Sequence, residues 1–154
     1  MSSDFQSSDQ LATIAQELRS VDRPSADLMY SLAEKTSRRL QRQSANFTQL
    51  DRLIAAGALT EAILLLVEFE LPLWKLRRIA YDEGEWHCAL SRERELPEWL
   101  DQAIEAYHPD LTVAIALSYV EALKAAAPSR RLAGPTVPQV GTRCFETFLC
   151  DNYA

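Results

Sequence analysis

Residues 74–99 read WKLRRIAYDEGEWHCALSRERELPEW, and this stretch decides the expected fold. At its centre, Tyr81-Asp82-Glu83-Gly84-Glu85 predicts a type I turn that ends with Gly84 in the left-handed conformation, a common three-residue hairpin loop. Glycine suits that position because it has no Cβ to clash at positive φ. We therefore expect one antiparallel β-hairpin, with strands over about 74–81 and 85–91.

The predicted hairpin has two different faces. Pairing outward from a three-residue loop sets Ala80 opposite Trp86 and Arg78 opposite Cys88. Because side chains alternate along a strand, the face expected on the core carries Leu76, Arg78, Ala80, Trp86, Cys88 and Leu90, and the other carries Arg77, Ile79, Tyr81, Glu85, His87 and Ala89. A lone hairpin is marginal in water, so it must lie on helices, gain a third strand or pair with another chain.

Helical patterns lie on both sides of the hairpin. Apolar spacing, capping residues and prolines predict a first helix that starts near Ser8 or Asp9 and ends before Pro24, and further helices over about 25–42, 48–56, 61–70, 97–107 and 110–127. The run 62–67 is apolar all round, so we expect helix 61–70 to be the central buried element on which the hairpin packs. A third strand at 61–70 is the alternative, because a short apolar run does not separate strand from helix. The expected fold class is α+β, mostly helical, with one hairpin packed on helices.

Capping residues and composition mark the ends of these segments. Ser25 and Thr60 are predicted N-caps, and Gly57 is predicted to end the helix over 48–56. Residues 1–8 are serine-rich and expected to fray. Three of the seven prolines and two of the four glycines lie in 128–154. We therefore expect one globular domain over 1–127, followed by a linker-like tail over 128–154.

Composition narrows the classes of partner. The chain has 154 residues, of which 47% are hydrophobic and 25% charged, which is ordinary for a globular domain. Its formal net charge of −6 works against binding to nucleic acid or to an anionic membrane. Arg38, Arg39 and Arg42 could form a phosphate or nucleic-acid patch, but cations are also favoured at a helix C-terminus by the macrodipole.

The sequence favours a reduced, cytoplasmic setting. Its start, MSSDFQSSDQ, lacks the basic and apolar regions of a signal peptide. The longest apolar run, 62–67, is far shorter than the ~20 residues that span a bilayer. Cys88, Cys144 and Cys150 are odd in number and show no CxxC spacing, which speaks against a disulfide framework.

Catalytic and metal chemistry find little support in the sequence. His87 and Cys88 are adjacent, so in a strand they point to opposite faces and cannot act as a dyad. His87 and His108 have no third ligand at a useful spacing. The acidic residues of the turn and of the RERE run (92–95) are expected in solvent, without the burial that acid–base work requires. No nucleotide-binding or hydrolase motif is present, so we expect no catalytic residue, no metal and no cofactor.

A longer pattern runs through the hairpin and its flanks. It comprises GALTEA (57–62), ELPLWKLRR (70–78), YDEGEWHCALS (81–91), LPEWLD (96–101) and AIA (114–116). This pattern resembles a set of small alphaproteobacterial proteins of unknown function and covers about half of the chain. The resemblance implies no activity, cofactor or catalytic residue.

The sequence therefore favours a non-enzymatic interaction or regulatory module, homo-oligomeric through the hairpin region. Tryptophan and arginine are favoured interface anchors, and an unpaired hairpin edge invites pairing. The alternative is a small-ligand binder or enzyme with a pocket between the hairpin and the 97–107 helix. The expected ligand- or partner-binding residues are Trp74, Arg78, Trp86, His87, Cys88 and Trp99.

Overall fold

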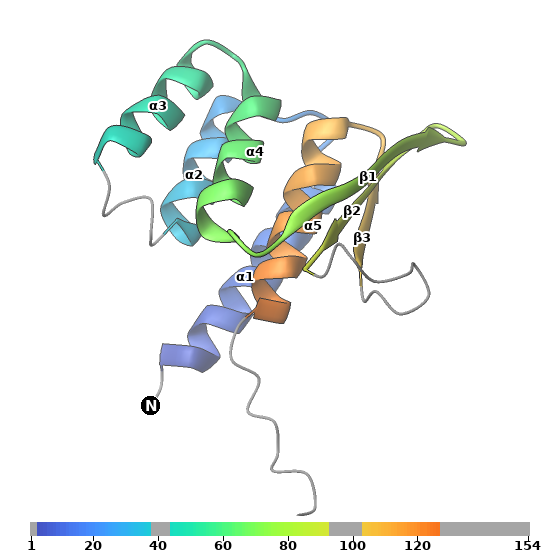
Figure 1. The fold of residues 1–154 in the computed structure, drawn as a ribbon, viewed down its shortest axis with the longest axis horizontal. Helices are drawn as coiled ribbons and strands as arrows, with labels where there is room; N and C mark the ends of the chain where they lie inside the picture. The colour runs from blue at the N-terminus through green and yellow to red at the C-terminus, as the bar shows by residue number, and fades with distance from the viewer. Residues whose placement is uncertain (1–2, 38–43, 93–102, 127–154) are drawn as a thin grey trace, which may run out of the picture.

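The computed structural model describes residues 3–37, 44–92 and 103–126. Within these ranges the fold is α+β, with five helices and a three-stranded antiparallel sheet packed against the last helix (Figure 1). This confirms the predicted class. The elements are α1 (Ser3–Ser20), α2 (Ala26–Thr36), α3 (Ser44–Ala55), α4 (Leu59–Glu70), β1 (Lys75–Asp82), β2 (Glu85–Ser91), β3 (Ile104–His108) and α5 (Leu111–Ala126).

The hairpin gains a third strand, but not from the segment considered for it. Residues 61–70 lie in helix α4, as preferred, and the third strand is β3, which pairs with β2 to give the order β1-β2-β3. The predicted helix over 97–107 is therefore wrong at its second half. Ile104, Ala106 and His108 alternate with the exposed Glu105 and Tyr107, which is the period of two that a half-buried strand requires.

The turn of the hairpin is one residue shorter than predicted. Asp82 pairs with Glu85, and the two residues between them, Glu83 (φ 50) and Gly84 (φ 87), both have positive φ. Two consecutive positive φ values define a type I′ turn, whose twist matches that of the flanking strands. The three-residue loop was therefore the wrong prediction.

The shorter turn moves Arg78 to the other face of the sheet. Arg78 pairs with Ala89 and Ile79 with Cys88, because a one-residue change of register exchanges the two faces. An irregularity between Leu76 and Arg78 then restores the expected pairing of Leu76 with Leu90.

The two faces of the sheet differ in what lies over them. The helix-side face contacts α5, since the Cys88 thiol lies 3.3 Å from the Ser118 hydroxyl of α5. By the observed register this face carries Tyr81, Trp86, His108, Ile79, Cys88 and Ala106, whereas the outer face carries Ala80, His87, Tyr107, Arg78, Ala89 and Glu105.

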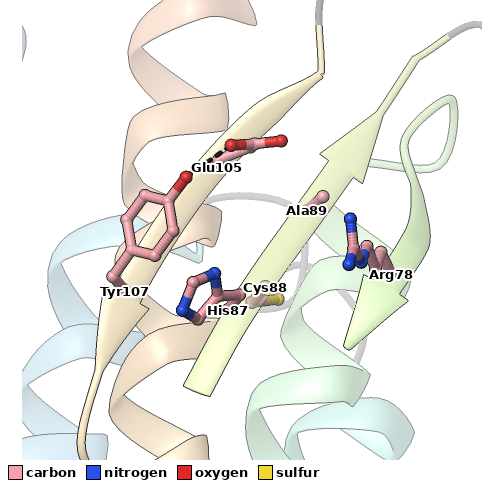
Figure 2. Close-up of a pocket in the computed structure, with 6 residues that line it drawn as sticks. All are labelled: Arg78, His87, Cys88, Ala89, Glu105 and Tyr107. Carbon is pink, nitrogen blue, oxygen red and sulfur yellow. Dashed lines mark hydrogen bonds between the residues drawn. The ribbon is translucent and has the colours of Figure 1, made fainter. Parts of the chain in front are cut away.

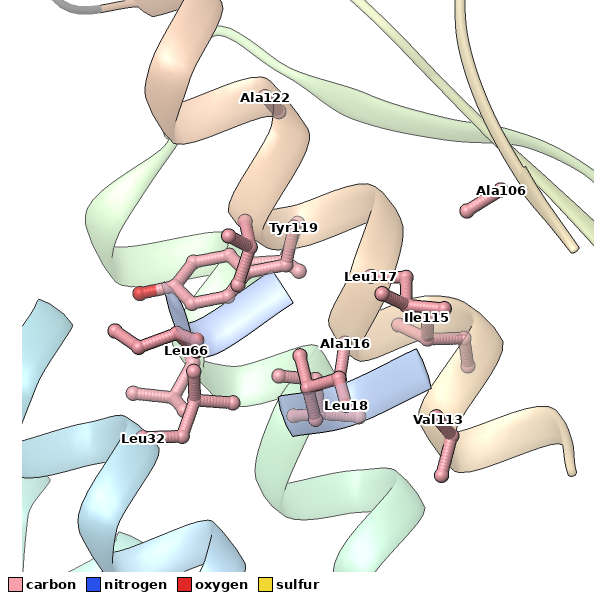
Figure 3. Packing of buried hydrophobic residues seen from close by; sticks show 14 of the residues in the cluster. Leu18, Leu32, Leu66, Ala106, Val113, Ile115, Ala116, Leu117, Tyr119 and Ala122 are labelled. Carbon is pink, nitrogen blue, oxygen red and sulfur yellow. The ribbon is translucent and has the colours of Figure 1, made fainter. Parts of the chain in front are cut away.

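Helix α5 is the centre of the molecule, a role that the sequence assigned to 61–70. Every residue of 112–120 is buried, because β2 and β3 pack on one side of α5 and α1 and α4 on the other. Figure 3 shows Leu32 and Leu66 near Tyr119 on one side of α5, and Ala106 of β3 on the other. The hairpin therefore packs on α5 and not on α4, whose Leu64 is 36% exposed.

Helix ends agree with the predictions where a capping residue decides them. The Ser25 hydroxyl accepts a hydrogen bond from the Leu28 N–H, and Gly57 follows α3 at φ 76, so both predicted caps are confirmed. Thr60 is not the N-cap of α4, since Ala58 holds that position and the Thr60 hydroxyl lies 2.6 Å from that of Thr112.

Other boundaries differ from those predicted. α1 begins at Ser3 rather than near residue 9, although 1–8 were expected to fray. α2 ends at Thr36, and α3 begins at Ser44 instead of 48. The predicted arginine cluster of residues 38, 39 and 42, and the predicted tail over 128–154, lie outside the described residues.

Candidate functional site

The outer edge of β1 is the first candidate feature. In the part of the chain that the structure describes, β1 pairs with β2 on one side and with no strand on the other. Figure 1 shows the turn end of the hairpin extending beyond the helices. An open edge presents a row of backbone N–H and C=O groups with which another strand can pair.

The register identifies which backbone groups of β1 point outward. Asp82 and Glu85 close a two-residue turn, and such a closing pair exchanges both of its hydrogen bonds. Alternation then directs the N–H and C=O groups of Ala80 and Arg78 toward β2, and those of Ile79 and Tyr81 away from it. Ile79 and Tyr81 are therefore the residues that could pair with an incoming strand.

The same two residues leave apolar surface on the helix-side face. The side chains of Ile79 and Tyr81 are 41% and 60% exposed, although they lie on the face that is buried in β2 and β3. α5 packs on β2 and β3, and so the part of this face that belongs to the turn end of β1 extends beyond the described helix that covers the rest. The Tyr81 ring contacts that of Trp86, with centroids 5.0 Å apart, which fixes the ring beside the edge.

Charge is separated along β1. Lys75 and Arg78 lie in its first half, whereas Asp82, Glu83 and Glu85 gather at the turn. All five side chains are exposed. An antiparallel partner strand with the same distribution of charge would therefore place opposite charges beside one another.

The outer face contains a small hollow, shown in Figure 2. Its volume is about 130 Å³, and its lining residues are Arg78, His87, Cys88, Ala89, Glu105 and Tyr107. The His87 and Tyr107 rings lie nearly perpendicular to each other at a centroid distance of 4.5 Å, and the Tyr107 hydroxyl donates a 2.5 Å hydrogen bond to Glu105. That bond raises the pKa of Tyr107, while the charge of Arg78 lowers it in part. The polar groups of the hollow are thus partly engaged with one another.

Cys88 is a buried structural thiol. Its side chain is 1% exposed and faces Ser118, away from the hollow on the outer face. Burial raises the pKa of the Cys88 thiol, and the hydrogen bond with Ser118 offsets this only in part. A reactive cysteine needs a lowered pKa and access to solvent, so this geometry does not favour nucleophilic chemistry.

A second hollow, of about 350 Å³, lies between α2 and α3. It is lined by Tyr30, Ala33, Glu34, Phe47, Leu50 and Asp51. The Tyr30 hydroxyl donates to the Asp51 carboxylate at 2.7 Å, and this bond raises the pKa of Tyr30. These two polar groups already satisfy each other, and the exposed rings of Tyr30 and Phe47 contribute apolar surface to the hollow.

The residues predicted as a binding site are distributed over three environments. Trp74 and Cys88 are buried in the core, at 8% and 1% exposure. Trp86 is half-buried on the helix-side face, whereas Arg78 and His87 lie on the outer face. Trp99 lies outside the described residues. The structure therefore brings Arg78 and His87 together, and separates both from Trp86.

Two pairs of residues at the open edge and the outer hollow were not predicted as site residues. Ile79 and Tyr81 form the open edge, and Glu105 and Tyr107 line the outer hollow. The alternation in IEAYH (104–108) is the signal that could have identified β3 and its outward pair.

Within the described ranges no three His, Cys, Asp or Glu side chains converge as a metal site. None of the helices described there is long and apolar enough to cross a bilayer.

Comparison of the chain with family models, curated proteins and solved structures gave no match.

Proposed function

We propose that this protein is a non-enzymatic interaction module that binds an extended protein segment along the open edge of β1. The observation that carries the proposal is the coincidence, at Ile79 and Tyr81, of outward backbone groups with exposed apolar side chains. Addition of a strand to a sheet edge uses both: main-chain hydrogen bonds supply affinity, and the side chains of alternate residues supply specificity.

The hollows support a small-ligand function less well. Ligand pockets usually enclose about 300–1,000 Å³ and bury most of the ligand, whereas the outer hollow encloses about 130 Å³. The hollow between α2 and α3 is larger, but its Tyr30 and Asp51 are paired with each other. At the outer hollow, burial raises the pKa of the Cys88 thiol, which is the reverse of what a nucleophilic cysteine needs.

A photo-crosslinking experiment tests the proposal. The photoreactive residue p-benzoylphenylalanine replaces Ile79 in the full chain, and in a matched control it replaces Arg52, which is exposed on α3. After irradiation in the cells that express the protein, we expect discrete protein adducts, identified by mass, from position 79 and not from position 52.

A proline variant shows whether the edge itself is responsible. Tyr81→Pro removes an outward N–H, and proline is tolerated on an edge strand where its N–H would face solvent. We expect Tyr81→Pro to abolish the adducts at position 79, and Tyr81→Phe, which keeps the ring and the N–H, to retain them. Adducts that survive Tyr81→Pro, or that form equally at position 52, would contradict the proposal.

A further inference from the structure

We infer that the segment docking on β1 is the β1 strand of a second copy of this chain, antiparallel about a two-fold axis at Ala80. This inference rests on the proposed function and adds to it the partner and the register. A two-fold axis at Ala80 sets Ile79 of each copy opposite Tyr81 of the other, and Arg78 of each copy opposite Asp82 of the other.

Backbone geometry permits this register. Ile79 and Tyr81 both direct their N–H and C=O groups away from β2, so the two Ile79–Tyr81 pairs would exchange four hydrogen bonds between the copies. The two Ala80 residues would face each other as the non-hydrogen-bonded pair between them. The irregularity at the start of β1 confines the paired segment to 78–82.

Side chains fit the same register on both faces. On the helix-side face, the exposed Ile79 and Tyr81 of one copy would cover those of the other. On the outer face, each Arg78 guanidinium would lie beside an Asp82 carboxylate, which gives two symmetric pairs of opposite charge. Directly opposed apolar and oppositely charged pairs both stabilise antiparallel strands.

Neighbouring registers lack this complementarity. A two-fold axis at Arg78 sets the two guanidinium groups against each other, and like charges directly opposite are destabilising. An axis at Ile79 sets Arg78 opposite Ala80, and an axis at Tyr81 sets Asp82 opposite Ala80, so neither forms a charge pair. If the register between the two strands changed by an odd number of residues, each residue would lie opposite one that belongs to the other face of the sheet.

A charge-exchange experiment tests the inference. Arg78→Asp gives a strand with acids at both positions, and Asp82→Arg gives a strand with arginines at both. Each variant alone would oppose like charges, so we expect sedimentation velocity to show self-association weakened by roughly tenfold or more relative to the parent chain. An equimolar mixture restores both charge pairs, and we expect a 1:1 heterodimer. Circular dichroism establishes that each variant is folded.

A cysteine at the axis provides a measurement independent of charge. Opposed residues of a non-hydrogen-bonded pair have Cα atoms about 4.5 Å apart, which lies within the range that a disulfide bridges. With Cys144→Ser and Cys150→Ser in the background, Ala80→Cys should form a disulfide-linked dimer on mild oxidation. Arg78→Cys is the matched control, since the two copies of residue 78 would lie far apart. This variant should form no disulfide-linked dimer under the same oxidation.

The outcomes separate the inference from the proposed function. A mixture that stays monomeric, or an Ala80→Cys chain that forms no more dimer than Arg78→Cys, overturns the register with a second copy. If Tyr81→Pro still abolishes the adducts at position 79, the interaction module stands and its partner is another protein. Adducts that survive Tyr81→Pro contradict both the proposed function and the pairing with a second copy.

Discussion

At the scale of single residues, Tyr119 links α5 to the end of α2. Its ring is fully buried on α5, and its hydroxyl donates a 3.0 Å hydrogen bond to the Thr36 hydroxyl at the end of α2. Thr36 in turn donates to the Leu32 carbonyl. Burial raises the pKa of Tyr119 well above its ordinary range, and the bond to Thr36 reverses only part of that change. Tyr119 is therefore held neutral in the folded chain.

This residue gives a prediction for stability and its pH dependence. Tyr119→Phe removes one buried hydrogen bond, so we expect the free energy of unfolding at pH 7 to fall by about 1 kcal/mol. Above about pH 10 the phenol ionises in the unfolded chain but not in the folded one, so the parent chain loses stability as the pH rises. The Phe variant lacks that loss. The difference in the free energy of unfolding between the two chains, measured by urea unfolding, should therefore be smaller at about pH 10.5 than at pH 7. A constant difference would contradict the assigned role.

At the scale of elements, the turn between β1 and β2 sets the register of the whole sheet. Glu83 and Gly84 both have positive φ, a conformation that glycine adopts freely and that asparagine tolerates far better than glutamate. A Cβ built on Gly84 would meet no atom within 4 Å, so the requirement for glycine there is one of backbone conformation and not of space.

Two substitutions in the turn should therefore act in opposite directions. Glu83→Asn creates the Asn-Gly pair preferred in type I′ turns and should raise the free energy of unfolding by roughly 0.5–1 kcal/mol. Gly84→Ala forces a Cβ into positive φ and should lower it by about 1–2 kcal/mol. Urea unfolding of both variants, at a concentration where the chain is monomeric, measures the two changes. A loss of stability in Glu83→Asn would contradict the turn type.

At the scale of the whole molecule, α5 connects the sheet to the helical layer. Its buried stretch includes Ala114, Ala116, Ser118 and Ala122, whose small side chains let β2 and β3 approach on one side while α1 and α4 pack on the other. The ion pair of Arg19 with Glu121 at 3.1 Å lies between α1 and α5, and its partly exposed position limits its contribution. Packing on two sides of α5 is therefore what unites the fold.

A volume change on α5 tests this arrangement. Ala116→Leu adds three carbon atoms where the side chain is 1% exposed and should destabilise the protein by about 1–3 kcal/mol, since overpacking forces neighbours to move. Ala125→Leu on the exposed end of the same helix is the matched control and should change stability by less than about 0.5 kcal/mol. Equal effects in thermal or urea unfolding would show that α5 is not the packed centre.

What the sequence by itself determined was local. The α+β class, the site of the hairpin, the Ser25 and Gly57 caps and the helix over 61–70 all follow from side-chain period and from backbone preferences within a few residues. Tertiary structure decided the register, the third strand and the central helix. A loop one residue shorter moved Arg78 away from Trp86 and Cys88 and so changed the candidate site. The five residues of β3 adopt a strand because β2 offers an edge and α5 a buried face, and neither is visible in residues 104–108 alone.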